Sequence, residues 1–255
     1  TEDVFEKAVG LDGQSVGIKF KRDGNYYLSL DLKLTETICI MPGQKITICL
    51  NQCDIVNNTT RAFAVAGELK LTDCTKQGTV MGGTTSNSGT LKLLNQGKLE
   101  LFAGTLLGNK LCQQGGVVGI STDSGNIVDN TVTVAPQMDM YGGSITGGQA
   151  EKGGNIHIWC ANGILQIYGG QVTGAVGNTD SILVTQGTLT LHADARIGGN
   201  SGADLHLGKS GKLQLADYTG STAVSVKMEQ PGVFAACESD LSAAFTSYDE
   251  QYAVY

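Results

Sequence analysis

The chain has 255 residues, with a formal net charge of −7, 36 glycines, three prolines and seven cysteines. A net negative charge repels phosphate backbones and anionic lipids, which argues against nucleic acid and membrane surfaces as partners. No apolar run is long enough to cross a bilayer, so we expect no membrane insertion by this segment. Many glycines and few prolines suit a chain that turns often and keeps its backbone donors for β-sheets.

The first 35 residues precede the regular part of the sequence. Apolar residues between positions 4 and 9 follow helical spacing after an acidic start, which predicts a short amphipathic cap. Residues 24–35 alternate apolar and polar side chains, and this alternation predicts a strand that leads into the first coil. We therefore assign residues 1–35 to an N-terminal cap and this strand.

A repeated apolar pair dominates the middle of the chain. In each pair a single residue separates two apolar residues, and a Gly or Asn turn lies nearby. The pairs are Ile46/Ile48, Leu69/Leu71, Leu99/Leu101, Met138/Met140, Leu165/Ile167, Leu189/Leu191 and Leu213/Leu215. The steps between them are 23, 30, 39, 27, 24 and 24 residues. Such spacing is typical of a solenoid in which two coils carry longer loops.

Two further apolar segments accompany each pair. One precedes it, at residues 38–40, 63–65, 91–93, 132–134, 156–158, 182–184 and 205–207. The other follows it, at Ile55, Val80, Leu106, Ile145, Val172, Ile197 and residues 224–226. Because alternation buries every second side chain, three strands per coil predict three parallel sheets around one apolar core. We predict an all-β fold, a single-stranded right-handed parallel β-helix of about seven coils, over residues 36–229.

Residues 230–255 lose the coil pattern and gain aromatic side chains. Unpaired strand edges at the end of a solenoid recruit other chains unless something covers them. We therefore expect residues 230–255 to form a C-terminal cap. No Pro- or Ser-rich linker interrupts the sequence, so we expect one domain over residues 1–255.

Several segments carry a family resemblance. They are KITICLNQCDIVN at residues 45–57, MDMYGGSITGG at 138–148, LQIYGGQVTGA at 165–175, GTLTLHADARIGGN at 187–200 and VSVKMEQPGVF at 224–234. Together they resemble secreted or cell-surface right-handed β-helix proteins, of pectate-lyase-like architecture, from Gram-positive gut commensal bacteria. The resemblance covers residues 26–255 and implies an extracellular or cell-surface location. It supplies no reaction, because this architecture occurs in lyases, hydrolases, adhesins and inert spacers alike.

Aligning the coils gives two outward rows on the second strands. The polar row consists of Thr47, Lys70, Glu100, Asp139, Gln166, Thr190 and Gln214. Two positions further along, four consecutive coils carry the aromatic row, which is Phe102, Tyr141, Tyr168 and His192. Rings about 5 Å apart on neighbouring strands stack, and an exposed stack can bind sugars or a protein. The predicted ligand-binding residues are the aromatic row with Glu100, Asp139 and Gln166. The alternative is that the ladder only stiffens the solenoid.

Glu100 and Asp139 also suggest an enzyme. Carboxylates on adjacent coils would lie near the roughly 5 Å separation that retaining glycosidases use. Two like charges at that distance raise one pKa, which would make an acid and a base from two similar groups. The alternative function is therefore a polysaccharide hydrolase or lyase acting near Glu100 and Asp139.

The remaining reactive residues give weaker patterns. The cysteines form no CxxC pair, and Cys53 and Cys74 lie at similar phases of successive coils, yet buried thiols are the favoured interpretation. His157 and His206 share an outward row of the first strands, two coils apart and too distant to share one ion. We expect both to be solvated surface histidines. The sequence predicts neither a metal site nor a cofactor.

These observations favour a non-enzymatic binding or adhesion module on a bacterial cell surface. Its partner would be a host surface or secreted protein, such as an immunoglobulin or a mucosal glycoprotein, or a glycan. A plain spacer between an anchor and a distal domain is a third interpretation. The known catalytic sets of this architecture are missing from the sequence, and fold alone assigns no chemistry.

Overall fold

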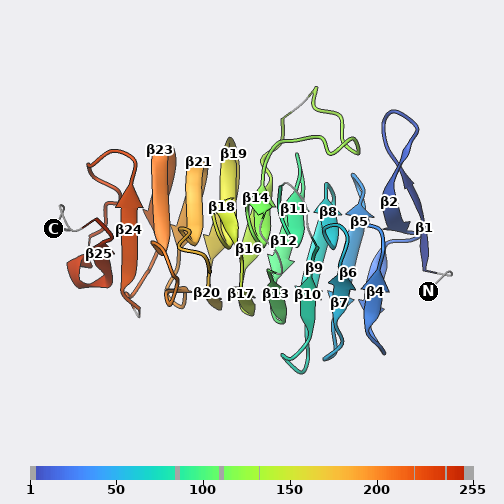
Figure 1. Ribbon diagram of the computed structural model, residues 1–255, viewed down its shortest axis with the longest axis horizontal. Coiled ribbons are helices and arrows are strands. Elements are labelled where there is room, and N and C mark those ends of the chain that lie inside the picture. The colour runs from blue at the N-terminus through green and yellow to red at the C-terminus, as the bar shows by residue number, and fades with distance from the viewer. Residues whose placement is uncertain are drawn as a thin grey trace.

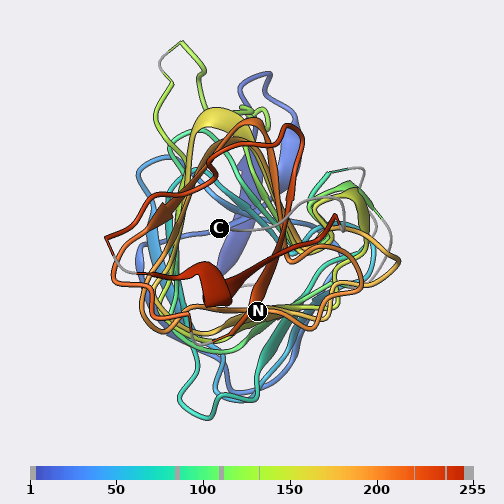
Figure 2. The same cartoon turned by 90° about the vertical axis from the view of Figure 1, so that its left-hand side faces the viewer.

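The computed structural model describes residues 4–83, 87–108, 112–131, 133–220, 222–238 and 240–249. The regular structure of these residues is almost entirely β-strand, with a single 3-10 helix, η1 (Ser242–Ala244). The strands wind around one axis from the N-terminal to the C-terminal end, as the blue-to-red colour order along Figure 1 and the end-on view of Figure 2 show. The fold is a β-solenoid of about nine turns with three parallel sheets.

Sheet 2 contains the apolar pairs that define the repeat. Its strands are β3 (Gly24–Tyr27), β6 (Lys45–Cys49), β9 (Glu68–Thr72), β12 (Lys98–Leu101), β16 (Gln137–Met140) and the C-terminal halves of β19 (Ile156–Ile167), β21 (Ile182–Leu191) and β23 (Leu205–Leu215). The Cα partners align the pairs without a shift, for example Leu99 with Met138 and Met138 with Leu165. The predicted stacking phase of sheet 2 is therefore confirmed.

Sheet 1 precedes sheet 2 in eight turns of the described chain and continues alone through its last two strands. Its strands are β2 (Ser15–Phe20), β5 (Ile38–Ile40), β8 (Phe63–Val65), β11 (Leu91–Leu93), β15 (Val118–Ile120), the N-terminal halves of β19, β21 and β23, then β24 (Val224–Met228) and β25 (Phe245–Ser247). Because β19, β21 and β23 run through both faces, sheets 1 and 2 are continuous in the C-terminal turns.

Sheet 3 follows sheet 2 in seven turns of the described chain. Its strands are β4 (Leu32–Leu34), β7 (Ile55–Asn57), β10 (Thr79–Met81), β13 (Thr105–Leu107), β17 (Ser144–Thr146), β20 (Gln171–Thr173) and β22 (Arg196–Ile197). A short side sheet joins β14 (Cys112–Gln114) to β18 (Ala150–Lys152).

Three expectations about the strands are wrong. The sheet 1 strand of the fourth predicted coil is Val118–Ile120, which pairs with Leu91–Leu93 and Ile156–Ile158, and not residues 132–134. Of those residues, Val132 lies outside the described part. Residues 224–226 pair with the sheet 1 part of β23 and so do not belong to sheet 3. Residues 24–35 form two strands, β3 and β4, and together with β2 they add a turn before the seven predicted coils.

The N-terminal end is covered by a strand where a helical cap was expected. β1 (Phe5–Val9) pairs antiparallel with β2, so the unpaired edge of the first turn gains a hydrogen-bonding partner. That pairing outweighs the helical spacing of the apolar residues. The rings of Phe5, Phe20 and Tyr26 lie 4.7 and 4.4 Å apart and cover the end of the core.

One apolar core runs along the solenoid. Aliphatic side chains from all three sheets fill it, and most of them are fully buried. At the C-terminal end, Phe245 contacts Tyr218 and Phe234 at ring distances of 5.8 and 5.3 Å. Aromatic side chains thus cover both ends of the core. Every inner turn packs against one turn on each side.

A second, smaller apolar cluster lies outside sheet 1. The β1–β2 hairpin and the segment after β15 project from the same side of the solenoid (Figure 1). Ala8 from the hairpin, Leu94, and Ile127 and Val128 from the segment are buried together. The backbone N–H of Leu11 donates to the carbonyl of Asn126 at 2.8 Å, which joins the two. The outer face of sheet 1 is therefore partly covered.

The surroundings of sheet 1 overturn the expectation for one histidine. The outer row of sheet 1 is Cys39, Ala64, Lys92, Gly119, His157, Leu183 and His206. His157 is 2% exposed rather than solvated, and its ring lies 4.8 Å from the Trp159 ring. Burial lowers the pKa of His157 to about 4, with a further contribution from Lys152.

Candidate functional site

The aromatic row occupies the first position after four consecutive strands of sheet 2. Each member continues the backbone ladder beyond its strand: Tyr141 N–H donates to the Leu101 carbonyl at 2.8 Å and Tyr168 N–H to the Met140 carbonyl at 2.8 Å. His192 N–H donates to the Ile167 carbonyl at 2.9 Å. The side chains therefore keep the strand register at the point where the chain turns.

The four rings form one continuous stack. The centroid distance is 4.9 Å from Phe102 to Tyr141, 4.8 Å from Tyr141 to Tyr168 and 3.9 Å from Tyr168 to His192. The first two pairs are nearly parallel, with interplanar angles of 16° and 12°. The structure thus brings together all four aromatic residues that the sequence analysis placed in one row, at the spacing of adjacent parallel strands.

The first two rings of the row are open to solvent, whereas Tyr168 and His192 are half-buried. Phe102 is 44% and Tyr141 is 42% exposed, which is unusual for large rings in contact with each other. Among the described residues, the hydroxyls of Tyr141 and Tyr168 make no hydrogen bond within the protein. Burial and the Asp139 carboxylate raise the pKa of Tyr141, so its hydroxyl remains a donor near neutral pH.

Glycine turns fix the position of the row. Gly143 follows Tyr141 by two residues and Gly170 follows Tyr168 by two, with φ values of 79° and 84°. A side chain is strained at such φ, and a Cβ on Gly170 would lie 2.7 Å from the Gly143 carbonyl oxygen. The glycines allow successive turns to approach at strand spacing, which the stacking of the rings requires.

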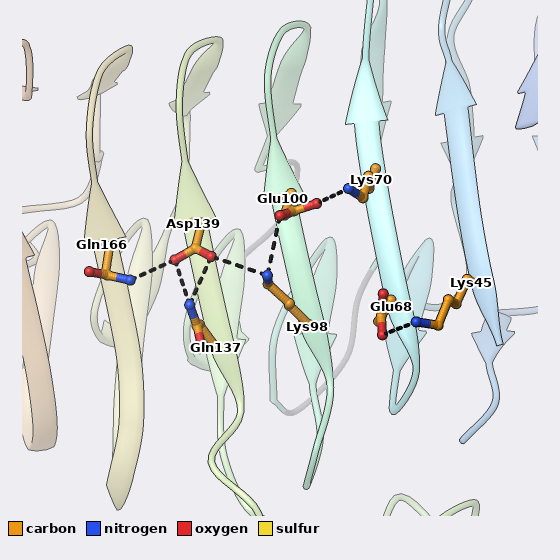
Figure 3. Close-up of polar contacts among 8 residues, drawn as sticks. All are labelled: Lys45, Glu68, Lys70, Lys98, Glu100, Gln137, Asp139 and Gln166. Atoms are coloured by element: carbon orange, nitrogen blue, oxygen red, sulfur yellow. Dashed lines mark hydrogen bonds and ion pairs between the residues drawn. The ribbon is translucent and has the colours of Figure 1, made fainter. Parts of the chain in front are cut away.

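The polar row runs beside the rings and is held together internally (Figure 3). Lys70 pairs with Glu100 at 2.6 Å, and Lys98 lies between the two carboxylates, 3.2 Å from Glu100 and 3.7 Å from Asp139. Gln137 donates to Asp139 at 2.8 Å, and Gln166 donates to it at 3.0 Å. Opposite charges on adjacent strands stabilise their pairing.

This arrangement does not give the carboxylates the properties of an acid and a base. Burial raises the pKa of Glu100, but hydrogen bonds from Lys70 and Lys98 outweigh it and hold that pKa below its ordinary value. Asp139 is only 3% exposed and its oxygens already accept from glutamine amides. The expected rise of one carboxyl pKa is absent at Glu100.

A shallow pocket lies next to the aromatic row, at the turn between sheets 2 and 3. It has a volume of about 250 Å³ and is lined by Gly143, Gly170, Gln171, Asp194 and Arg196. Asp194 follows His192 by two residues, as the two glycines follow the tyrosines. An acidic and a basic side chain thus stand where the row meets the turn.

Sequence reasoning missed part of this surface. Lys98 and Gln137 are paired in adjacent strands two positions before Glu100 and Asp139, so a third aligned row would have shown them. Asp194 and Arg196 come after β21, at the turn into β22, where the conformation of the turn rather than strand alternation determines which way a side chain points. In the described residues, no three His, Cys, Asp or Glu side chains gather in a way that could hold a metal ion.

Comparisons with known proteins add no identity. No protein-family model matches the chain, and no similar curated protein or solved structure was found. No helix in the described residues is both long and apolar enough to cross a membrane. What is established is an all-β solenoid with a continuous, partly exposed aromatic stack at the end of the sheet 2 strands.

Proposed function

We propose that this protein is a non-enzymatic bacterial surface module that binds a host protein or glycan through the outer face of sheet 2. The observation that carries the proposal is the stack of Phe102, Tyr141 and Tyr168, in which Phe102 and Tyr141 are exposed and Tyr168 is half-buried. Large exposed aromatic surfaces mark interaction sites in soluble proteins, and tyrosine is enriched in them because it offers an apolar ring and a polar tip.

The stacking geometry indicates how a partner would lie. Tyr141 has Phe102 on one face and Tyr168 on the other, at centroid distances of 4.9 and 4.8 Å. A sugar ring cannot insert between rings at that distance. A partner would therefore lie across the ring edges and the two phenolic hydroxyls, along the solenoid axis. This geometry favours a protein or glycoprotein surface over isolated sugars stacked on ring faces.

The neighbouring groups supply polarity in different ways. Glu100 and Asp139 have their charges satisfied by Lys70 and Lys98, so they support the surface more than they attract a charged partner. The pocket with Asp194 and Arg196 is the polar feature open to a partner's side chain or hydroxyls. Specific interfaces combine an apolar centre with such hydrogen-bonding positions around it.

No observation favours the enzymatic alternative. The lowered pKa of Glu100 keeps this group ionised, whereas a general acid needs a raised one. Lys98 also lies between the two carboxylates, where the substrate of a glycosidase would have to reach.

The cellular setting is part of the proposal. The segments at residues 138–148 and 165–175 supply both the tyrosines and the glycine turns, and they resemble cell-surface β-helix proteins of Gram-positive gut commensals. On this basis we assign the chain to the cell surface or the secreted fraction, with a right-handed, pectate-lyase-like winding.

An array that carries glycans together with immunoglobulins and mucosal glycoproteins tests the proposal. The full chain is compared with the triple variant Phe102→Ser, Tyr141→Ser, Tyr168→Ser. The matched control is Tyr248→Ser, which changes a tyrosine that is 45% exposed but outside the row. We expect at least about a tenfold loss of affinity for the triple variant, as for loss of hot-spot aromatic residues, and no loss for the control.

Circular dichroism verifies that each variant retains its β-structure. Binding that survives the triple substitution would contradict the proposal, as would the absence of binding to every array component. Polysaccharide depolymerisation that Glu100→Gln abolishes would instead establish the enzymatic alternative.

A further inference from the structure

We propose that Cys49 and Cys74 are a disulfide-forming pair that covalently joins two successive turns of sheet 2. Their Sγ atoms lie 3.0 Å apart, within about 1 Å of a disulfide bond length of about 2.05 Å. The inference is independent of the proposed binding function, because it rests on this geometry and on the chemistry of thiols.

The register of β6 and β9 places the two thiols side by side. Cys49 is the last residue of β6, and its Cα partner on β9 is Thr72. Cys74 follows Thr72 by two residues, so strict alternation along β9 would continue the outward row to it. The two cysteines therefore stand on the same outer face of adjacent turns.

Asp73 holds the turn that aims Cys74 at Cys49. Its side chain is 3% exposed, and its oxygens accept from the backbone N–H groups of Gly78 at 2.6 Å, Thr75 at 3.1 Å and Gln52 at 3.2 Å. The last bond links the turn after β6 to the turn after β9. Because Cys49 lies just before the first of these turns and Cys74 lies in the second, this hydrogen bond limits the motion of the two cysteines relative to each other.

The other cysteines are placed differently. Cys39 and Cys160 are buried, and burial raises their thiol pKa to about 12 and about 11. Cys112 is also buried, and burial raises its thiol pKa. Cys53, the residue that sequence phase matched with Cys74, instead directs its thiol at the Asn51 carbonyl at 3.6 Å. The partner of Cys74 is therefore Cys49, and these two thiols are half-buried and exposed, whereas buried thiols were expected.

The chemistry balances with a small-molecule disulfide, such as oxidised glutathione, as the oxidant. The thiolate of exposed Cys74 attacks one glutathione sulfur, so a mixed disulfide forms and one glutathione thiolate leaves. The Cys49 thiolate then attacks the Cys74 sulfur and displaces the second glutathione. Two protein thiols are oxidised, one glutathione disulfide is reduced to two thiols, and the two thiol protons pass to the departing glutathiones.

The bond would close a loop across one solenoid turn, since the two residues are 25 apart in sequence. A cross-link of this length restricts the unfolded chain more than the folded one. It would restrain the turns on the N-terminal side of the aromatic row, because Cys49 and Thr72 precede Phe102 in the same outward row.

The test oxidises the full chain with oxidised glutathione, blocks remaining thiols with iodoacetamide and digests the protein with trypsin without reduction. Cys49 and Cys53 share the tryptic peptide 46–61, whereas Cys74 lies in 71–76. We expect one cross-linked species of these two peptides, and a rise in Tm of about 5 °C relative to the reduced protein.

Matched variants decide which cysteine reacts. The cross-link should persist in Cys53→Ser and disappear in Cys49→Ser and in Cys74→Ser. Its persistence in Cys49→Ser would show that Cys53 is the partner and would overturn the proposal. Full alkylation of Cys49 and Cys74 after oxidation of the wild-type chain would overturn it as well.

Discussion

The outer faces of sheets 1 and 2 follow the same repeat but present different surfaces. On sheet 2 the polar and aromatic rows run along the solenoid, and Tyr141 remains 42% exposed. On sheet 1 the outer row contains Lys92 and His157, which are 7% and 2% exposed. The two faces have the same strand spacing and the same alternation. What separates them is the cover on sheet 1. The Trp159 ring lies beside both His157 and Lys92. The β1–β2 hairpin and the segment after β15 bury Cys39 and Leu94.

In this solenoid the repeat determines which side chains are in register, whereas the segments between strands help to determine which of them are exposed. Stacked turns bring equal positions together wherever the turns have equal geometry. Whether a side chain of such a row is exposed or buried then depends on segments that are distant from it in sequence. Ala8 and Ile127 meet over sheet 1 although more than a hundred residues separate them.

The largest expected difference between the two faces concerns Gly119 in the outer row of sheet 1. A Cβ at Gly119 would lie 1.9 Å from Ser88 Oγ and 2.7 Å from the Trp159 ring. Gly119→Val should therefore lower the free energy of unfolding by about 3 kcal/mol, the cost of overpacking a buried site. Urea denaturation measures this change.

The control is Thr47→Val in the polar row of sheet 2, where a β-branched side chain suits a strand. We expect a change within about 0.5 kcal/mol for this variant. Equal changes in the free energy of unfolding for the two substitutions would show that the outer face of sheet 1 is not covered at Gly119.

The next effect depends on pH and arises from His157. Its pKa is about 4 in the folded protein and about 6.5 in the unfolded chain. Because the folded value is the lower one, the unfolded state binds more protons between these values, and stability falls as pH decreases from 6.5 toward 4. Between about pH 7 and about pH 5 the loss should be about 2 kcal/mol.

Urea titrations at several pH values check this prediction with His157→Gln, which should remove most of that slope. Thr47→Val, which changes no titratable group, should leave the slope in place. An unchanged slope in His157→Gln would mean that His157 is accessible to protons in the folded state.

A smaller effect distinguishes two ion pairs within sheet 2. Lys98 contacts Glu100 and Asp139, whose side chains are 12% and 4% exposed, whereas Lys45 and Glu68 are 68% and 42% exposed. Lys98→Met should cost about 1 to 2 kcal/mol, because two nearly buried carboxylates lose a cation. Lys45→Met should cost less than about 0.5 kcal/mol. Unfolding free energies in low salt measure both, and a reversed order would contradict the charge network of Figure 3.

Much of the fold follows from the sequence because the repeat is strongly expressed in sheet 2. One apolar pair per turn with a nearby turn residue was enough to align Glu100 with Asp139 and Phe102 with Tyr141. Every aromatic contact of the row followed from that alignment. The same reasoning failed at residues 118–136, because Val118–Ile120 and residues 132–134 are both short apolar alternations. Nothing local indicates which of them precedes the loop.

The remaining differences also have nonlocal causes. β1 has the apolar spacing of a helix, but the free edge of β2 offers backbone partners that a helix would leave unused. The burial of His157 depends on Trp159 of the same strand and on Thr185 of the next turn, whose hydroxyl lies 2.8 Å from Nε2. Cys74 meets Cys49 because Asp73 is turned inward, and that depends on three backbone donors from two turns.

The central claim is that the aromatic row is the surface that binds a partner. Hydroxyl-radical footprinting of the full chain, alone and saturated with its strongest array ligand, tests this claim residue by residue. We expect protection of Phe102, Tyr141 and Tyr168 in the complex and no change at Tyr218, which lies in the C-terminal end of the core. Protection confined to sheet 1 or sheet 3, with the three rings as reactive as in the free protein, would contradict it.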